Sequence, residues 1–323
     1  MDIVWLIIGL LLILGGANWL TDGASAIAKK WGVSDLIIGL TVVAFGTSTP
    51  ELSIGIISAL RGSAPLAIGN VVGSNIFNIF VIIGIVALIH PIKIERSVLN
   101  TQIPLVILSS LALLAIGCGP WLGVPGPSEI IRPEAILLFL FLLVFMKYTF
   151  SQAKTASPED PSAQQASAIV PMNIWKAIGL VIIGLGALVF GGDRFVAGAS
   201  GIASSLGMSE ALIGLTIVSA GSSLPELATS ILAALKGKTG IAVGNVIGSN
   251  IFNIFMVLGI TGTILPLPFG GIELFDLLIM TGASILFWLF GRQFGNKVID
   301  RWEGGVLLAC YIGYISAQIF TYG

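Results

Sequence analysis

The chain alternates between long apolar runs and short polar breaks, which is the pattern of helices that cross a membrane repeatedly. A spanning helix needs about 20 mainly apolar residues. Ten such runs are predicted, each bounded by polar residues, proline or glycine: 3–28, 35–60, 66–90, 99–118, 133–150, 174–203, 211–235, 241–265, 272–291 and 303–321. The predicted fold class is an all-α membrane protein with ten transmembrane helices.

Composition agrees with this pattern and excludes a soluble domain. Of the 323 residues, 56% are apolar and only 10% are charged, and the mean hydropathy is +1.03. Cys118 and Cys310 are isolated in apolar surroundings, which fits neither a metal site nor a disulfide framework. The first apolar run follows an acidic residue and continues past any cleavage site, so it is expected to be a first span rather than a signal peptide.

The basic residues predict the orientation of the spans. Lys and Arg collect on the cytoplasmic side of membrane proteins. If the N-terminus lies outside, the outer loops hold only Arg61 and Arg132, and all other loop Lys and Arg residues face inward. Both termini are therefore expected outside the cytoplasm. The short loops favour a prokaryotic plasma (inner) membrane.

The two halves of the chain repeat each other. Shifting the sequence by 175 residues aligns Gly9 to Ile85 with Gly184 to Ile260 without a gap, and AIGNVVGSNIFNIF (67–80) matches AVGNVIGSNIFNIF (242–255) at 12 of 14 positions. With five spans in each half, an odd number, the halves are predicted to be inverted, as in secondary transporters. The predicted organisation is a first repeat at 1–150, a cytoplasmic linker rich in Ser, Ala, Pro and Gln at 151–172, and a second repeat at 173–323.

The second span of each half carries a proline and a glutamate at membrane depth. The segments are GTSTPE (46–51) and GSSLPE (221–226). Proline has no amide hydrogen and breaks a helix, and freed backbone groups in a membrane must be buried in protein or line a polar cavity. Broken helices are therefore predicted around a midplane site, namely the second, third, seventh and eighth.

Oxygen-bearing side chains gather near these breaks. On one helical face Thr47 and Ser48 precede Glu51, and the second half repeats the set with Ser222, Ser223 and Glu226. In the third and eighth spans the pairs are Ser74 with Asn78, and Ser249 with Asn253, each at i, i+4. Hydroxyl, amide and carboxylate oxygens suit hard cations such as Na⁺ and Ca²⁺.

The two glutamates set the charge of this site. A carboxylate inside a membrane is costly unless a cation or proton accompanies it. Glu51 and Glu226 together balance one Ca²⁺ or two monovalent ions. If the divalent and monovalent ions occupy one cavity only in turn, their mutual exclusion is the physical basis of antiport.

GTSTPE and GSSLPE are each followed by a GN(x)(x)GSN(x)(x)N stretch, and each of these motif pairs lies in a half of five spans. With this arrangement the sequence resembles the cation/Ca²⁺ antiporter superfamily, and its Na⁺/Ca²⁺ exchanger branch most closely. The resemblance covers essentially the whole chain. It implies that Glu51 and Glu226 are the central ligands, and that Thr47 and Ser222 offer oxygens for Ca²⁺. It also implies flanking Na⁺ sites at Ser48, Ser74, Ser223 and Ser249, and ligating backbone carbonyls at Ala44 and Ser219.

One position departs from that family pattern. Na⁺/Ca²⁺ exchangers commonly carry an Asp where this chain has Asn253, so the polar centre has one carboxylate fewer. This difference leaves two alternatives for the ion whose gradient drives Ca²⁺ transport. Exchange of Ca²⁺ for Na⁺ is the favoured function, and H⁺/Ca²⁺ antiport is the alternative. A cation channel is disfavoured because inverted repeats in one chain favour alternating access, and an enzyme is disfavoured because the single His90 cannot supply a catalytic metal set.

The expected partners follow from this function. They are the transported Ca²⁺ and Na⁺, with H⁺ as the alternative coupling ion, together with the lipid bilayer. No prosthetic cofactor, no nucleic acid and no obligate protein partner is expected.

Overall fold

The structure is a computed structural model that describes residues 1–62, 64–123, 126–155, 172–206, 219–270, 272–293 and 297–322. It is mostly helical. In chain order the elements are α1 (Asp2–Trp31), α2 (Asp35–Ile38), η1 (Gly39–Val43), α3 (Ala44–Thr47), α4 (Thr49–Leu60), α5 (Ala64–Phe77), η2 (Asn78–Ile83), α6 (Gly84–Ile89), β1 (Ile92–Lys93), η3 (Val98–Gln102), α7 (Ile103–Gly117), η4 (Gly119–Leu122), β2 (Glu129–Ile130), α8 (Arg132–Thr155), α10 (Ile174–Ser205), α12 (Ser219–Ser222), α13 (Leu224–Leu235), α14 (Thr239–Ile251), η7 (Phe252–Leu258), α15 (Gly259–Ile264), β3 (Leu267–Pro268), α16 (Leu274–Gln293), β4 (Val298–Ile299) and α17 (Arg301–Tyr322).

Eight helical stretches within the described residues are long and apolar enough to cross a membrane. They coincide with eight of the ten predicted spans: Asp2–Trp31, Asp35–Leu60, Ala64–Ile89, Val98–Gly117, Arg132–Gln152, Ile174–Ile202, Thr239–Ile264 and Leu274–Arg292. The seventh predicted span starts at 211–218, outside the described residues, and continues as the shorter apolar helix α13. The tenth corresponds to α17, which is helical but is not among the eight.

The chain forms two compact units, and each takes segments from both sequence halves. The first unit comprises Met1–Pro50 and Phe145–Gly248, and the second comprises Glu51–Val144 and Ser249–Gly323. Most of the predicted linker, residues 156–171, lies outside the described residues. Three helices, α4, α8 and α14, continue from one unit into the other, so the division does not follow the ends of helices.

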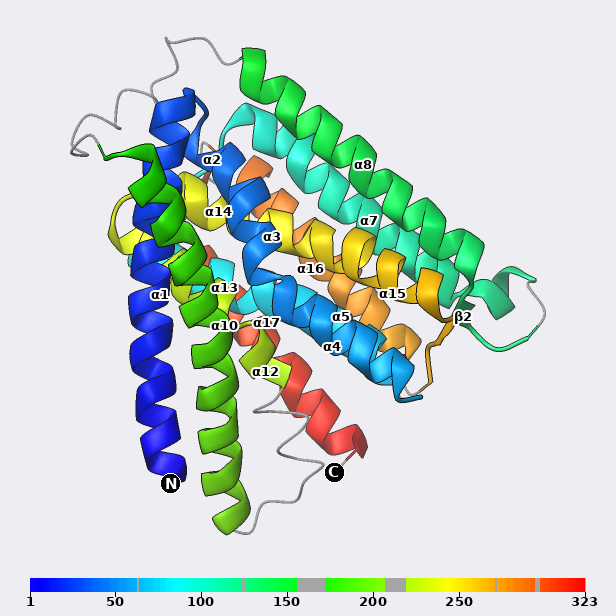
Figure 1. The fold of residues 1–323 in the computed structure, drawn as a ribbon. Coiled ribbons are helices and arrows are strands. Elements are labelled where there is room, and N and C mark those ends of the chain that lie inside the picture. The colour runs from blue at the N-terminus through cyan, green and yellow to red at the C-terminus, as the bar shows by residue number, and fades with distance from the viewer. Residues whose placement is uncertain are drawn as a thin grey trace. The chain divides into compact units, whose positions relative to one another are not determined.

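In the first unit α1 and α10 lie side by side over most of their length (Figure 1). The two helices approach backbone to backbone, because a Cβ atom at Gly16 would come within 2.7 Å of the Gly184 carbonyl oxygen and one at Gly23 within 2.7 Å of the Ala177 carbonyl oxygen. Such glycine contacts are a common way to join membrane helices closely. The α1 and α10 pair also contacts α13.

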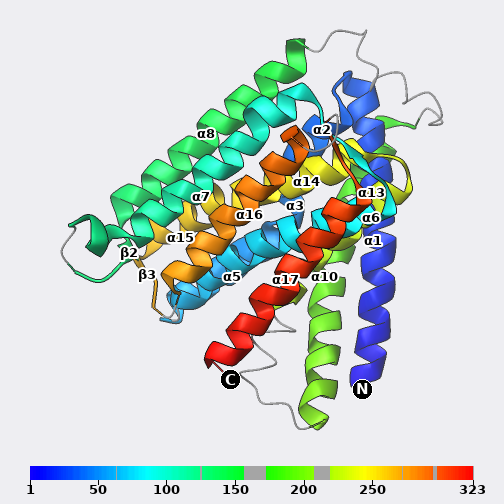
Figure 2. The ribbon, with the colours of Figure 1, turned by 180° about the vertical axis from the view of Figure 1, so that it is seen from behind.

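In the second unit α7 packs on α16, and α17 packs on η2 and α6 (Figure 2). Two short antiparallel ladders lie outside the spans. β1 pairs with β4 through Ile92 and Ile299, and β2 pairs with β3 through Ile130 and Leu267. All four of these residues are fully buried, so the ladders are part of the packed structure.

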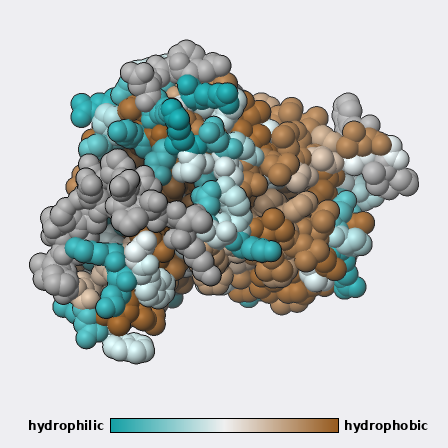
Figure 3. Space-filling view, turned by 90° about the horizontal axis from the view of Figure 1, so that it is seen from above, coloured by the Kyte–Doolittle hydropathy of each residue, from teal (hydrophilic) through white to brown (hydrophobic). Residues whose placement is uncertain are grey.

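Apolar side chains cover much of the surface as well as filling the core, and many polar side chains are buried. Large apolar residues such as Leu11, Val144 and Ile182 are exposed, whereas Glu51, Glu226 and many Ser, Thr and Asn residues are buried. Figure 3 shows broad hydrophobic surface with hydrophilic residues gathered in patches. An apolar exterior of this extent fits a lipid environment, and together with the spanning helices it makes the chain an integral membrane protein.

The predicted helix breaks in the second and seventh spans are confirmed, and they lie two residues before each proline. Helix α3 ends at Thr47 and α4 begins at Thr49, with Ser48 between them at φ −83° and ψ 6°. In the other half α12 ends at Ser222 and α13 begins at Leu224, with Ser223 at φ −90° and ψ 7°. The two breaks therefore have nearly the same backbone geometry, as the sequence repeat requires.

The third and eighth spans widen rather than break, which differs from the predicted form. Here α5 continues into the π-helical η2, which starts at Asn78, and α14 continues into the π-helical η7, which starts one residue before Asn253. A π-helical turn shifts the backbone hydrogen bonds by one residue and occurs often at functional sites. The chain contains no proline in these stretches, so nothing forces the helices to stop.

Candidate cation site

The first unit brings Ser48 and Glu226 together. The hydroxyl of Ser48, in the break before α4, lies 3.5 Å from Glu226 Oε1 in the first turn of α13. Both side chains are buried. A carboxylate at the start of a helix is favoured by the exposed amide groups and the positive end of the helix dipole. Oxygen atoms from the two broken spans thus meet within this unit.

Asn245 of α14 joins the same two breaks. Its Oδ1 atom accepts a hydrogen bond from the Thr47 hydroxyl at 3.1 Å. Its Nδ2 group donates to the Glu226 backbone carbonyl at 3.3 Å and to Ser230 Oγ at 3.1 Å. Asn245 is fully buried, so its amide bridges α3 and α13 in a place that water does not reach.

In the second unit four asparagines form two reciprocal pairs. Asn78 Nδ2 donates to Asn250 Oδ1 at 3.0 Å, and Asn253 Nδ2 donates to Asn75 Oδ1, also at 3.0 Å. Asn78 and Asn253 are 175 positions apart, as are Asn75 and Asn250, so the pairs reflect the sequence repeat. Asn75 is fixed further, because its Nδ2 group donates to the Asn250 backbone carbonyl at 3.2 Å.

These pairs leave two buried oxygens as acceptors. The Oδ1 atoms of Asn78 and Asn253 have no hydrogen-bond partner among the described residues, although both side chains are fully buried. A buried amide oxygen without a donor costs roughly 1–3 kcal/mol. The donors of both amides are already used by Asn250 and Asn75, so the free ends are the oxygens, which are ligands that Na⁺ and Ca²⁺ accept.

The remaining predicted residues lie as follows. Glu51 is fully buried in the first turn of α4 and belongs to the second unit, whereas Glu226 belongs to the first. Ala44 starts α3, and its carbonyl accepts from the Thr47 hydroxyl at 3.4 Å. The side chains of Ser74, Ser222, Ser223 and Ser249 are buried, and Ser223 Oγ has no partner among the described residues. Ser219 begins α12, but its side chain lies outside the described part.

Three further asparagines form hydrogen bonds with the predicted site residues, and all three lie in the repeated sequence motif. Asn75, Asn250 and Asn245 belong to the repeated GN(x)(x)GSN stretches. Asn245 contacts the Thr47 hydroxyl and the Glu226 backbone carbonyl, whereas Asn75 and Asn250 hold the side chains of Asn253 and Asn78. The motif marks these positions, but only the coordinates identify their partners.

Several membrane spans and buried oxygen-bearing side chains that recur in both halves of the sequence are what a cation transporter requires. The family model of the sodium/calcium exchanger protein matches residues 1–150 and 176–320, and the chain belongs to this family. Its members are exchangers, which move ions rather than catalyse a chemical reaction.

Two curated relatives and one solved structure illustrate the similarity. The chain is 39% identical to CaxA of Alkalimonas amylolytica, assigned as an antiporter, over 96% of each chain. It is 33% identical to the inner membrane protein YrbG of Escherichia coli over 94% of each chain. The structure of the sodium-calcium exchanger NCX_Mj soaked with Na⁺ and Ca²⁺ superposes with a TM-score of 0.83 at 30% identity, covering 98% of this chain and 97% of that one.

Proposed function

We propose that this chain exchanges Ca²⁺ for Na⁺ across a membrane by alternating access. The observation that carries the proposal is the pair of buried amide oxygens on Asn78 and Asn253, which have no donor among the described residues. Family membership supports cation and Ca²⁺ antiport, and the NCX_Mj relative is a sodium-calcium exchanger by name.

In this proposal Glu51 and Glu226 are the central ligands and carry the two negative charges of the site. Asn78 and Asn253 add neutral oxygens. The flanking ligands are the hydroxyls or backbone carbonyls of the other repeat-related positions, which are Ala44, Thr47, Ser48, Ser74, Ser219, Ser222, Ser223 and Ser249. Support comes from the Ser48 to Glu226 contact and from the burial of both glutamates.

Charge balance accounts for exchange. One Ca²⁺ neutralises two carboxylates, and so do two Na⁺ ions. A second set of cations on the same ligands would leave excess positive charge in a medium of low dielectric constant, where it is strongly disfavoured. Ca²⁺ and Na⁺ therefore bind in turn, and the gradient of one drives the other.

The proposed topology has ten spans in two inverted five-helix repeats, at 1–150 and 173–323, with 151–172 as the cytoplasmic linker. Both termini face away from the cytoplasm of a prokaryotic cell. The distribution of Lys and Arg supports this orientation. The inner membrane location is supported by the name of the E. coli relative.

The proposed motion is a slide of α1 and α10 along the rest of the protein, moving as a pair. Their backbone-to-backbone packing supports joint movement. Gly16 and Gly191 lie at the contact between the two helices, where a Cβ atom would come within 2.7 and 2.8 Å of the facing helix. Gly15 and Gly192 do not closely approach the facing helix.

The coupling ion is tested in inside-out vesicles. We expect vesicles loaded with Na⁺ to take up Ca²⁺ when the outside is Na⁺-free, and we expect little uptake from a pH gradient alone. Uptake driven by the pH gradient without Na⁺ would instead support the H⁺/Ca²⁺ alternative. Uptake without either gradient, at a rate that does not saturate, would support a channel.

A further inference from the structure

Asn245 holds two of the proposed ligand-bearing segments at once. Thr47 is the last residue of α3, and Glu226 lies in the first turn of α13. The two segments come from different halves of the sequence. One buried amide accepts from the first and donates to the second. All four residues of this network, including Ser230, lie in the first compact unit.

One contact of this network cannot form at the repeat-related positions. Asn245 corresponds to Asn70, and its acceptor Ser230 corresponds to Gly55, which has no hydroxyl. A side chain at Gly55 would meet Thr261 Oγ1 and Val257 Cγ1, each at 3.0 Å, so this position is kept small by packing. The amide of Asn245 can therefore use an acceptor that Asn70 lacks.

We propose that Asn245 is a positioning residue that sets the spacing of Thr47 and Glu226 and thereby tunes ion affinity. This inference rests on the proposed function. Its amide touches the segments that carry the ligands and does not need to touch the ion. Outer contacts of this kind typically change metal affinity by about 10- to 100-fold when they are removed.

The test is a double-mutant cycle read by ion binding. In detergent, Asn245→Ala should raise the Ca²⁺ concentration for half-maximal thermal stabilisation by about tenfold. Ser230→Ala should give part of this loss by itself and should add little in the Asn245→Ala background, because its hydrogen-bond partner is already gone. Asn70→Ala is the matched control and should have the smaller effect.

The outcomes separate the inference from the proposed function. Wild-type protein that binds neither Ca²⁺ nor Na⁺ would overturn the function itself. Wild-type binding with unchanged affinity in Asn245→Ala would overturn the positioning role alone. So would a loss of thermal stability without ions that fully accounts for the loss of affinity, because that result would make Asn245 a purely structural residue.

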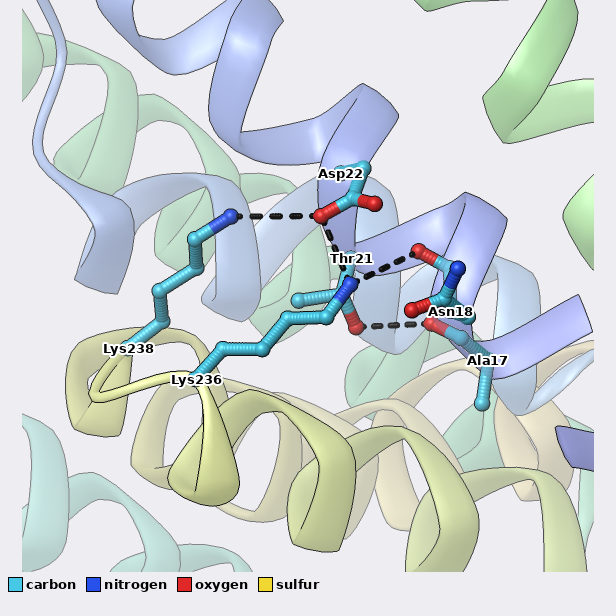
Figure 4. Close-up of polar contacts among 6 residues, drawn as sticks. All are labelled: Ala17, Asn18, Thr21, Asp22, Lys236 and Lys238. Atoms are coloured by element: carbon cyan, nitrogen blue, oxygen red, sulfur yellow. Dashed lines mark hydrogen bonds and ion pairs between the residues drawn. The ribbon is translucent and has the colours of Figure 1, made fainter. Parts of the chain in front are cut away.

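A different observation concerns the end of α1. Figure 4 shows Asp22 of α1 facing Lys236 and Lys238, which lie in the connection between α13 and α14. Asp22 Oδ1 is 2.7 Å from Lys236 Nζ and 3.6 Å from Lys238 Nζ, and Lys236 Nζ also donates to the Asn18 carbonyl at 3.4 Å. The cluster ties α1 to the α13–α14 connection within the first unit.

The two lysines differ in their surroundings. The side chain of Lys238 is 14% exposed and that of Lys236 is 26% exposed. Burial lowers the pKa of Lys238 from its ordinary value, and the nearby carboxylates of Asp22 and Asp35 oppose this shift. Because both lysine side chains are largely shielded from water, their ion pairs with Asp22 are stronger than fully exposed ion pairs.

The repeat-related positions cannot form the same ion pair. Asp22 corresponds to Ala197 of α10, which has no charge, although Lys236 corresponds to the basic Arg61. Inverted repeats of equal sequence would make the inward-open and outward-open states mirror each other in energy. An ion pair that has no repeat-related equivalent breaks this balance and favours one state.

We infer that Asp22, Lys236 and Lys238 form an ionic latch that holds α1 in the position seen here and opens when α1 slides. This inference also rests on the proposed function. A shift of α1 by one helical turn moves Asp22 by about 5.4 Å, which is enough to break both contacts. The latch therefore biases the equilibrium between the two transport states.

The test combines hydrogen exchange with transport. Asp22→Asn should speed amide exchange at the C-terminal end of α1, and it should shift the half-saturating Ca²⁺ concentrations on the two membrane sides in opposite directions by about three- to fivefold. Restoring the pair with reversed charges, Asp22→Lys with Lys236→Asp, should return both readouts toward wild type. Asp193→Asn is the control, because Asp193 pairs with its neighbour Arg194 on the same helix.

Amide exchange and transport test different parts of this inference. Unchanged amide exchange in Asp22→Asn would show that the contact does not hold α1, whatever the protein transports. Faster exchange with equal shifts on both membrane sides would overturn the bias between states. Absence of transport in the wild type would overturn the proposed function and leave the hydrogen-exchange result as the measure of the contact.

Discussion

Glu226→Gln should abolish Ca²⁺ exchange in vesicles while leaving the protein folded. Glutamine keeps the size of the side chain and can still accept from the Ser48 hydroxyl, whose distance to Glu226 Oε1 is 3.5 Å. It removes one of the two charges that balance Ca²⁺. Loss of a buried charge partner costs about 3 kcal/mol or more, which corresponds to at least a hundredfold loss of affinity. Glu51→Gln should behave in the same way, because it is the repeat-related position.

The matched control for this prediction is Glu303→Gln. Glu303 is also a fully buried glutamate in the first turn of a helix, and its Oε2 atom accepts from the Asp300 amide at 2.6 Å. A glutamine can make the same contact, and Glu303 lies outside the proposed site. Near wild-type exchange in Glu303→Gln, with none in Glu226→Gln, supports the site. Normal exchange in Glu226→Gln would remove Glu226 from it.

Much of this architecture could be predicted because membranes limit what a chain can do. Spans are long apolar helices, so eight of the predicted ranges agree with helices that meet the length and composition of a span. The breaks at Ser48 and Ser223 could be predicted because proline cannot continue a helix, and their similar backbone angles agree with the repeat.

The remaining features depend on contacts between distant residues. Nothing in the local sequence distinguishes a π-helical turn from an α-helical one, so the widening at Asn78 and Asn253 was predicted as a break. The motif identifies Asn75 and Asn250 as amides, but the reciprocal pairs depend on how α5 and η7 pack. The contact of Asp22 with Lys236 joins residues 214 positions apart and has no signature along the chain.

The reciprocal asparagine pairs also explain how this chain manages with one carboxylate fewer than exchangers commonly have. Asn253 donates to Asn75 Oδ1, and a carboxylate has no hydrogen to donate there. Asn75 cannot simply turn its amide around, because its Nδ2 group already donates to the Asn250 carbonyl. An amide at position 253 therefore satisfies Asn75 and still leaves its own oxygen without a donor among the described residues, as the proposed cation site requires.

Asn253→Asp is expected to make Ca²⁺ affinity depend strongly on pH. The new carboxyl group faces Asn75 Oδ1 at the place where Asn253 donates, so two acceptors meet unless a proton lies between them. While the group is protonated it is uncharged, as the asparagine is. When the proton leaves, the site gains a negative charge, and Ca²⁺ competes better. The half-saturating Ca²⁺ concentration should therefore fall by about tenfold as the pH rises through the titration of this group, whereas wild type should change little.

The control for charge is Asn253→Leu, which removes the oxygen and the donor together. It should weaken Ca²⁺ binding at every pH without adding pH dependence, because it introduces no titratable group. Asn78→Asp should reproduce the result of Asn253→Asp, since Asn78 donates to Asn250 Oδ1 at the same distance of 3.0 Å. Equal pH profiles for Asn253→Asp and wild type, measured as Ca²⁺-dependent thermal stabilisation in detergent, would mean that position 253 lies away from the bound ion.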